Sequence, residues 1–336
     1  MHQEAELPFV SIIIPTRNEE RFIAACLDSL ITGTYPRDRY EIIVVDGLSD
    51  DRTIEIVESY VGRQPVVRHL PNPKHIVSPA LNIGIRDARG EIVVRVDAHS
   101  LYATDYVEQS VRLLASSGAA NVGGRQLAVG GSVLGEAIAV ATGHGFGSGN
   151  ARYKVSEREE WVDTVYLGAW RKETLVRFCG FDETWGANQD YELNCRLREV
   201  GGRILLSPAI RSQYHVRDSL PALGRQYGRY GYWRAKTVLW HPRSLRARQL
   251  VPPAALVVAV AGACGLAGRP IWLAVLGLGV VLTYWLIAAW AVRQIRGIKP
   301  WLVAVAFAIC HFTWGIGFWT GLCRFTIPRV ARTKSA

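Results

Sequence analysis

Acidic and polar residues follow three apolar segments within the first hundred residues. Ile12–Ile14 leads to Glu19, Ile42–Val45 leads to Asp46, and Ile92–Val96 leads to Asp97. Parallel strands bind ligands at their carboxyl ends. Oxygen ligands at three such ends predict a site for a nucleotide, a divalent cation and phosphates.

Asp97 and His99 stand at alternate positions just past the third apolar segment, so their side chains can be aimed at one point. A carboxylate and an imidazole suit a divalent cation that also binds diphosphate oxygens. Mg²⁺ prefers oxygen, whereas Mn²⁺ accepts nitrogen more readily. The alternative is a surface aspartate beside a hydrogen-bonded histidine.

Asp46 and Asp51 each allow two interpretations. A carboxylate at this place can accept from a ribose hydroxyl or a base N–H. A carboxylate can also cap the helix expected at 53–60, which would suit Asp50 or Asp51. The segment Pro15–Glu19 is equally open, since Thr16 or Asn18 could cap the helix that follows.

Asp190 comes just before a helical pattern that continues through Leu193 and Leu197. An acid in the first turn often only compensates the helix dipole. In an active site, the same carboxylate could deprotonate a hydroxyl. Glu183 and Glu192 are rivals for that role.

Strand and helix patterns alternate through this part of the chain. Such alternation predicts an α/β fold, with a mostly parallel sheet covered by helices on both faces. A glycine-rich stretch, Gly143–Gly149, is expected to be a flexible loop at the rim of the site. The expected strands are 41–45, 66–70 and 91–96, and the expected helices are 22–30, 53–60 and 79–88.

The charge divides the chain sharply. All 29 acidic residues lie at or before Asp218, where 24 basic residues leave a net charge of −5, while residues 219–336 carry 15 basic residues and no acid. The basic residues flank apolar runs, so anionic lipid headgroups, and not nucleic acid, are the expected partner. No leader pattern precedes the first strand, which predicts that residues 1–218 stay in the cytosol. Six cysteines lack the spacing of a disulfide framework or a zinc site.

Three apolar runs, 250–268, 271–292 and 301–322, are each long enough to span a bilayer. The basic loop 293–299 should face the cytosol. Two spans agree with that, but a third would place the basic end from Arg324 onwards outside. Either the third run is re-entrant or interfacial, or the charge rule is overridden.

A basic and aromatic segment, Gln226–Arg234, lies just before the first apolar run. Its arginines could hold a diphosphate, since guanidinium groups match phosphate oxygens. It could equally be an interfacial helix with an aromatic belt.

Taken together, these motifs resemble the inverting family 2 glycosyltransferases of the GT-A fold. The likeness is strongest to the succinoglycan-type membrane glucosyltransferases, which extend polyprenyl-diphosphate-linked sugars. The matching motifs run in order from Val10 to about Arg234: PTRNE, VVDGLSDD, ALNIGI, VDAH, GAWRKETL, GFDETW, NQDYELNCRLREVGG and QYGRY.

The resemblance implies a role for each matching residue. Asp190 would be the catalytic base, and Asp97 and His99 would hold the divalent cation on the donor diphosphate. Two departures are His99 in place of aspartate and Tyr230 in place of tryptophan, while Gln189 stands where many relatives have glutamate. The other implied residues bind the nucleotide-sugar (Pro15, Thr16, Glu19, Asp46, Asp51, Asn82, Asp97) and the acceptor or its diphosphate (Gln226, Arg229, Tyr230, Trp233).

The implied reaction moves a hexose from a nucleotide-sugar, such as UDP-glucose, to a polyprenyl-diphosphate-linked saccharide with inversion. The alternatives are a polyprenyl-phosphate sugar synthase, a processive polysaccharide synthase and a non-catalytic membrane scaffold. The expected location is the cytoplasmic membrane, with the catalytic domain facing the cytosol. The expected domains are a GT-A domain (1–218), interfacial helices (219–249), two to three spans (250–323) and a basic tail (324–336).

Overall fold

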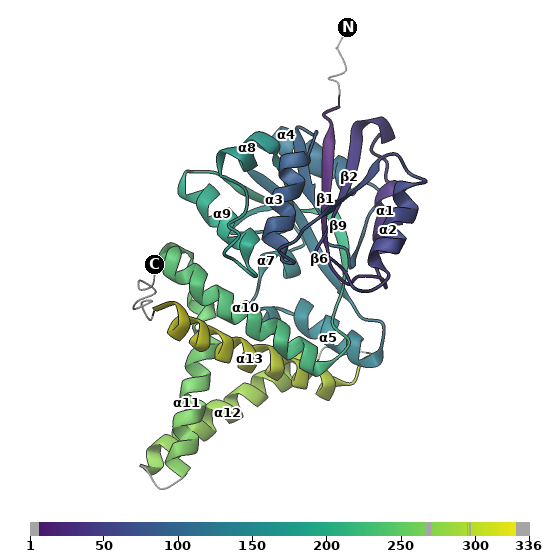
Figure 1. The fold of residues 1–336 in the computed structure, drawn as a ribbon. Helices are drawn as coiled ribbons and strands as arrows, with labels where there is room; N and C mark the ends of the chain where they lie inside the picture. The colour runs from purple at the N-terminus through teal and green to yellow at the C-terminus, as the bar shows by residue number, and fades with distance from the viewer. Residues whose placement is uncertain (1–6, 267–269, 294, 296, 327–336) are drawn as a thin grey trace, which may run out of the picture. The chain divides into compact units, whose positions relative to one another are not determined.

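A computed structural model describes residues 7–266, 270–293, 295 and 297–326. Two residues of the predicted run 250–268 and most of the predicted tail 324–336 lie outside the described residues. The chain forms two compact units. The sheet unit comprises residues 1–128 and 151–215, and the helical unit comprises residues 129–150 and 216–336 (Figure 1).

The sheet unit is built on a mixed sheet whose described strands run in the order β3-β2-β1-β4-β8-β6-β9-β5, with β7 beside β9. Strands β3 to β4 in this order are mutually parallel, so their carboxyl ends share one edge. Strand β4 then pairs antiparallel with β8. The strands are β1 (Val10–Thr16), β2 (Tyr40–Asp46), β3 (Val67–Pro71), β4 (Ile92–Arg95), β5 (Ser100–Tyr102), β6 (Asn121–Val129), β7 (Glu160–Val162), β8 (Tyr166–Arg171) and β9 (Ile204–His215).

Helices cover both faces of this sheet (Figure 1). One core holds side chains of α1 (Ile23–Ile31), α2 (Thr53–Val61) and α4 (Tyr106–Ser117). The other holds side chains of α3 (Val77–Asp87), α8 (Lys172–Arg177) and α9 (Gln189–Glu199). The predicted alternation, strands and helices are confirmed, with small differences at their ends. The short elements are η1 (Arg37–Arg39) and α7 (Arg152–Val155).

The helical unit contains the segment that was expected to be a flexible loop. Residues 143–149 instead end α5 (Val133–Gly143) and form α6 (Gly145–Ser148), so that prediction was wrong. The ring of Phe146 packs against the rings of Phe307 and His311, and its carbonyl lies 2.9 Å from the His311 Nε2. These contacts fix the segment on a helix from the far end of the chain.

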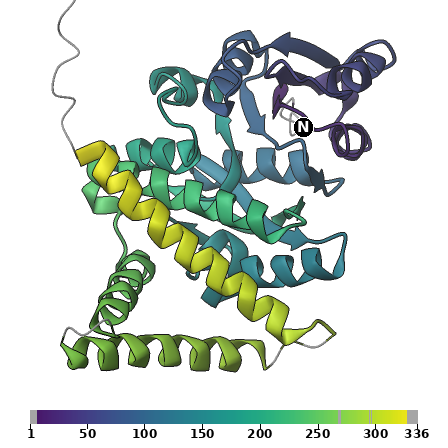
Figure 2. The same cartoon turned by 60° about the horizontal axis from the view of Figure 1, so that its bottom comes forward.

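Four long helices make up the rest of the helical unit: α10 (Leu220–Trp240), α11 (Val251–Leu266), α12 (Ile271–Val292) and α13 (Pro300–Thr326), with the turns η2 (Pro242–Ser244) and η3 (Ala247–Gln249) before α11. Helices α10 and α13 lie side by side (Figures 1 and 2). Their backbones approach closely at glycines. A Cβ atom on Gly317 would lie 2.0 Å from the carbonyl oxygen of Gly228, and one on Gly231 would lie 2.0 Å from that of Trp314.

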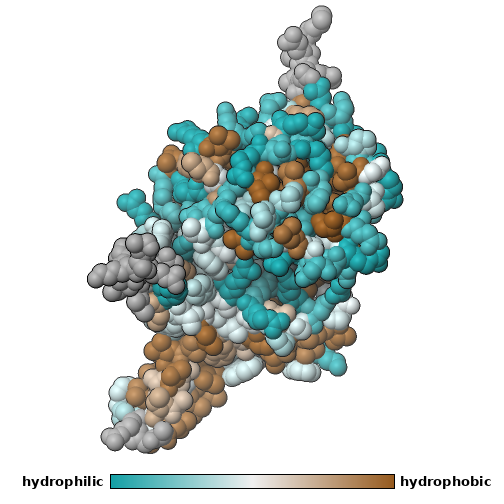
Figure 3. All heavy atoms as spheres, in the orientation of Figure 1, coloured by the Kyte–Doolittle hydropathy of each residue, from teal (hydrophilic) through white to brown (hydrophobic). Residues whose placement is uncertain are grey.

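Three helices of the described chain are long and apolar enough to cross a membrane: Ala247–Leu266, Ile271–Val292 and Pro300–Thr326. The third, α13, differs from the others. Of its most apolar stretch, 44% is buried inside the protein, against 17% for each of the other two. Figure 3 shows the hydrophobic surface concentrated over α11 and α12. At the C-terminal end of α13, Phe325 packs against Tyr232 and Trp240 of α10.

Candidate active site

Thr16 and Asp46 end the neighbouring strands β1 and β2 and are partners in their register. Both are buried. The Asp46 carboxylate accepts hydrogen bonds from the backbone N–H of Ser49 at 2.8 Å and from its hydroxyl at 2.5 Å. The loop after β2 is therefore folded back over the strand end by the aspartate that the sequence singled out. Pro15 pairs with Val45 one step earlier in the same register.

Hydrogen bonds join the loops that follow β1 and β2. The Asn18 N–H donates to the Ser49 hydroxyl at 2.9 Å, and the Asn18 side-chain oxygen accepts from the Asp50 N–H at 3.0 Å. Asn18 has a φ of 55°, in the left-handed region that asparagine tolerates better than most residues. The two loops therefore form one rim at the edge of the sheet.

Asp51 serves the start of α2. Its carboxylate accepts from the Thr53 N–H at 2.9 Å and from the Glu20 N–H at 3.2 Å. Desolvation opposes its ionisation, but these hydrogen bonds outweigh it and hold the pKa of Asp51 below its ordinary value. Asp51 therefore holds the turn that leads into α2, whose N-cap is Arg52, and this is close to the capping role that the sequence offered as the alternative to nucleotide binding.

Glu19 and His99 lie close together. The His99 Nδ1 is 3.0 Å from the Glu19 Oε1, and both side chains are largely buried. The Glu19 backbone N–H is held in turn by the Thr53 hydroxyl at 2.8 Å. The His99 ring also makes an edge contact with the ring of Tyr214. The loops after β1, β2 and β4 are thus linked through side chains.

Arg95, the last residue of β4, connects two predicted site residues. Its guanidinium donates to the Asp97 Oδ1 at 3.0 Å and forms a short ion pair with the Asp190 Oδ1. The Arg95 side chain is 6% exposed. Side chains alternate along a strand, so Arg95 shares a face with Val93, which packs in the core beneath α9. That face places the guanidinium at the start of α9, where Asp190 lies.

Two tyrosines also contact Asp97. The Tyr166 hydroxyl donates to its Oδ2 at 3.3 Å, and the Tyr102 hydroxyl accepts from its backbone N–H at 2.7 Å. Burial opposes ionisation of Asp97, but the charge of Arg95, followed by that of His99, holds its pKa below the ordinary value. Asp97 is therefore held as a carboxylate.

Asp190 has the opposite balance. Burial raises its pKa above the ordinary aspartate value, Asp97 adds to the rise, and Arg95 works against it. A carboxylate with a raised pKa is a stronger base than a solvated one. The rival residues are engaged elsewhere: Glu183 pairs with Lys74 at 2.6 Å, and Glu192 pairs with Arg196 at 2.6 Å.

Asn82 lies in α3 and holds a loop. Its side-chain amide donates to the Phe181 carbonyl at 2.8 Å and to the Glu183 carboxylate at 3.0 Å, and its oxygen accepts from the Phe181 N–H at 2.9 Å. Gly180 has a φ of +66°, and a Cβ there would lie 2.3 Å from the Asn82 oxygen. The amide thus fixes the segment that leads towards Asp190.

A divalent cation fits the donors at the β4 end. In the described part of the chain, no three or more His, Cys, Asp or Glu side chains come together as a ligand group for a metal ion. Mg²⁺ and related ions at phosphate sites commonly use only one or two protein ligands and take the rest from phosphates and water. Histidine ligands usually donate their other N–H to a carboxylate, and Glu19 stands in that relation to His99.

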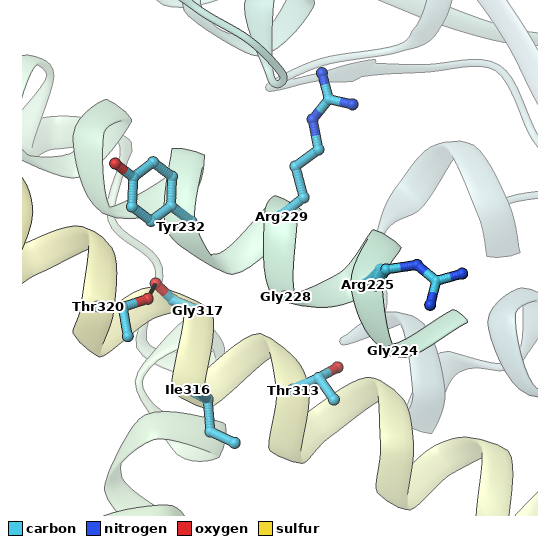
Figure 4. A pocket seen from close by; sticks show the side chains of 9 residues that line it. All are labelled: Gly224, Arg225, Gly228, Arg229, Tyr232, Thr313, Ile316, Gly317 and Thr320. Atoms are coloured by element: carbon cyan, nitrogen blue, oxygen red, sulfur yellow. Dashed lines mark hydrogen bonds between the residues drawn. The ribbon is translucent and has the colours of Figure 1, made fainter. Parts of the chain in front are cut away.

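The remaining predicted residues lie on α10 in the helical unit. The Gln226 side chain donates to the Tyr230 hydroxyl at 3.0 Å, and the Trp233 ring packs against Phe325 of α13. Figure 4 shows Arg229 projecting from α10 away from α13, and Arg225 projecting to one side of α10. Beside them, an open groove of about 520 Å³ is lined by Gly224, Arg225, Gly228, Arg229, Tyr232, Thr313, Ile316, Gly317 and Thr320.

Arg95 and Tyr166 are the site residues that the sequence reasoning missed. For Arg95 a signal was present, since a charged residue inside the apolar stretch Ile92–Val96 needs a buried partner. For Tyr166 there was none, because β8 comes beside β4 from more than 70 positions further along the chain, through antiparallel pairing.

Comparisons with known proteins agree with this geometry. Residues 11–164 match the family model "Glycosyl transferase family 2". The succinoglycan biosynthesis protein ExoA of Rhizobium meliloti (strain 1021) is 31% identical over 317 residues, which cover 94% of this chain and 95% of the relative.

Two further proteins have lower sequence identity to this chain. The dolichyl N-acetyl-alpha-D-glucosaminyl phosphate 3-beta-D-2,3-diacetamido-2,3-dideoxy-beta-D-glucuronosyltransferase of Methanococcus voltae is 27% identical over 66% of this chain and 72% of its own length. Among solved structures, the mannosyltransferase PcManGT of Pyrobaculum calidifontis, in complex with GDP-Man and Mn²⁺, superposes with a TM-score of 0.68 at 21% identity, covering 96% of this chain and 89% of that one. The predicted fold and family are confirmed: the chain belongs to glycosyl transferase family 2 and has a GT-A fold.

Proposed function

We propose that this glycosyltransferase moves a hexose from a nucleotide-sugar to a lipid-linked saccharide, with inversion at the anomeric carbon. The observation that carries the proposal is the pair of carboxylates on Arg95. Asp97 is held ionised at a strand end, while burial raises the pKa of Asp190. Two carboxylic acids whose pKa values are shifted in opposite directions suit two different tasks.

The donor binds at the edge formed by β1, β2 and β4. Asp46 and Thr16 face the nucleoside, and the backbone of the joined loops around Asn18 and Ser49 shapes its pocket. Asp51 acts by fixing this wall, and Asn82 acts by fixing the segment that leads towards Asp190, since their polar atoms are bonded to the protein's own groups.

Asp97 and His99 would hold a divalent cation, with Glu19 orienting the imidazole. When bound there, such an ion would supply positive charge against the charge that develops on the leaving diphosphate. Its use is supported by the donor set and by the Mn²⁺ named with the mannosyltransferase of the same fold. No protein nucleophile is required, because a single displacement inverts the anomeric centre.

Asp190 acts as the general base. It takes the proton from the acceptor hydroxyl as that oxygen attacks the anomeric carbon. Arg95 keeps the carboxylate in a fixed place through their ion pair. Proton transfer by a positioned base contributes about 10²- to 10⁴-fold to a rate.

The acceptor is carried on a lipid. Residues 219–336 of the helical unit carry no acid, and this part of the chain includes the three apolar helices, which suits a membrane-bound substrate. The groove between α10 and α13 offers glycines and threonine methyl groups, because the Thr313 and Thr320 hydroxyls bond to their own helix. Arg225 and Arg229, with Gln226, Tyr230 and Trp233 on the same helix, serve the phosphate groups. The Methanococcus relative is named for a dolichyl-phosphate-linked substrate, which supports a lipid acceptor already bearing a sugar.

The donor is proposed to be UDP-glucose or a similar UDP-hexose. This donor is implied by the resemblance of the sequence motifs to the succinoglycan-type glucosyltransferases, and the 31% identity to the succinoglycan biosynthesis protein along nearly the whole chain supports that resemblance.

The membrane arrangement is proposed to be two spans with an interfacial third helix. Helices α11 and α12 cross the bilayer and return. Helix α13 lies along α10, to which its last turn is joined by Phe325. The basic residue Arg324 then lies on the same side as the basic loop 293–299, in agreement with the positive-inside rule. The sheet unit faces the cytosol of the cytoplasmic membrane.

The test uses membranes containing the full chain, a panel of radiolabelled sugar nucleotides and two acceptors. One acceptor is a polyprenyl-diphosphate-linked saccharide, and the other is bare polyprenyl phosphate. We expect transfer to the saccharide only, and loss of about 10²-fold or more of that rate in Asp190→Asn with unchanged folding. Transfer to the bare lipid phosphate would establish the synthase alternative. A near-normal rate in Asp190→Asn would refute the base.

A further inference from the structure

Arg95 is a buried charge in the middle of the sheet. Its backbone lies between β1 and β8, where it pairs with Ile13 and Gly168. Removing a guanidinium from water costs several kcal/mol, so such a residue needs close compensation. Arg95 has two carboxylates, Asp97 and Asp190, and the three side chains together carry a net charge of −1 when both acids are ionised.

We propose that Arg95 is a positioning residue that couples the two halves of the reaction: it holds Asp190 in place and competes with the divalent cation for Asp97. The proposal rests on the proposed roles of Asp97 and Asp190. With a cation bound, Asp97 would be shared between two positive charges, and its ion pair with Arg95 would weaken. Arg95 then remains paired with Asp190 alone. Cation binding at the donor site thereby changes the ion pair of the catalytic base through a single side chain.

The hydrogen bonds of Asp97 are consistent with a competition between Arg95 and a cation. Both oxygens of Asp97 are engaged, one by Arg95 at 3.0 Å and one by Tyr166 at 3.3 Å, so a cation must compete with a protein donor. Within the described residues, the Arg95 Nε is buried and has no hydrogen-bond partner.

Arg68 provides a matched control in the same sheet unit. It also bridges two acids, Glu41 at 2.8 Å and Asp87, and it stands in β3 at the opposite end of the parallel strands. Arg68→Gln therefore removes a guanidinium from two carboxylates that have no part in the proposed reaction.

The first measurement is binding of Mn²⁺ alone to the purified full chain in detergent, followed by electron paramagnetic resonance of the free ion. Arg95→Gln should bind Mn²⁺ about tenfold more tightly than the wild type, because one neighbouring positive charge is gone. Transfer should fall by about 10²-fold, because Asp190 loses its anchor. Arg68→Gln should lower the melting temperature and leave both quantities unchanged.

Arg95→Lys keeps the charge but not the planar fork. It should bind Mn²⁺ within about twofold of the wild type and lose kcat with little change in the donor KM. If Arg95→Gln does not fold, this variant decides, and a wild-type kcat would overturn the positioning role.

Unchanged or weaker Mn²⁺ binding by Arg95→Gln overturns the competition, as does a wild type that binds no Mn²⁺. These outcomes are separate from failure of the proposed reaction. Full transfer by Asp190→Asn would refute the base assignment. The competition at Asp97 would still be tested separately, by Mn²⁺ binding to Arg95→Gln.

Discussion

The His99 Nδ1 lies 3.0 Å from the Glu19 Oε1, joining the loops that follow β1 and β4. The sequence motif assigned Glu19 to the nucleoside. The contact supports a different role, in which Glu19 fixes the orientation of the imidazole and the nitrogen that it presents. This also gives a reason for a histidine at this position, since a carboxylate on one ring nitrogen fixes the tautomer and the ring orientation of an imidazole ligand.

Removing the Glu19 charge should therefore weaken the cation site. Glu19→Gln is expected to reduce cation-dependent donor binding about 10- to 100-fold, the usual effect of changing a residue that orients a ligand. Thermal stabilisation by sugar nucleotide across a Mn²⁺ series measures it. The neighbouring Glu20→Gln is the control, because Glu20 accepts only from the Arg52 backbone among the described contacts of its carboxylate. Equal effects in both variants would point to the loop and not to the imidazole.

The rate of transfer should fall in mild acid. Asp190 must be deprotonated to act as a base, and burial raises its pKa above the ordinary 3.8. The base is therefore lost as the pH drops through that raised pKa, earlier than for a solvated aspartate. Initial rates between pH 4 and 8 measure this, with the melting temperature followed in parallel to exclude acid unfolding. A folded enzyme with a constant rate down to about pH 4 would contradict the assignment.

Packing of α10 against α13 should depend on single glycines. Gly317→Ala places a methyl group 2.0 Å from a backbone oxygen of α10, so the helices must separate. A loss of about 1–3 kcal/mol in stability is expected. Gly279→Ala in α12 is the matched control, because no heavy atom lies within 4 Å of its added Cβ. Thermal denaturation in detergent should distinguish the two, and similar melting temperatures would count against close packing.

The proposed topology can be read from native cysteines. Cys179 in the sheet unit and Cys323 near the end of α13 are both exposed. If α13 is interfacial, single-cysteine proteins retaining either residue should resist a membrane-impermeant maleimide in intact cells and react after permeabilisation. Leu266→Cys, at the exposed end of α11, should label from outside. Labelling of Cys323 but not Cys179 in intact cells would mean that α13 crosses the bilayer.

The elements of the sheet unit were predictable because their signals are local. Apolar runs such as Ile42–Val45 can only be buried strands in an alternating chain, and the acids at their ends follow from the parallel order. The link between Arg95 and Asp190 was not predictable, since it depends on how α9 lies against β4. The fold of residues 129–150 depends likewise on a helix more than 150 positions away.

The place of α13 shows the same limit. Its composition is that of a membrane span, and length and hydropathy alone treat it like α11 and α12. Only its contacts along α10 and α5 separate it from them. The charge pattern had raised the problem, because Arg324 would otherwise lie on the wrong side, but it could not choose between an interfacial helix and an exception to the rule.

The docking of α6 on α13 bears on how a soluble catalytic fragment can be prepared. Cutting the chain at the boundary expected from its charge, after residue 218, would remove Phe307 and His311 and leave residues 129–150 without the surface on which they fold. Phe146 and the apolar side of α5 would then face water and promote aggregation. A short hydrophilic linker in place of residues 129–150, combined with an end at His215, follows the division that the protein itself makes.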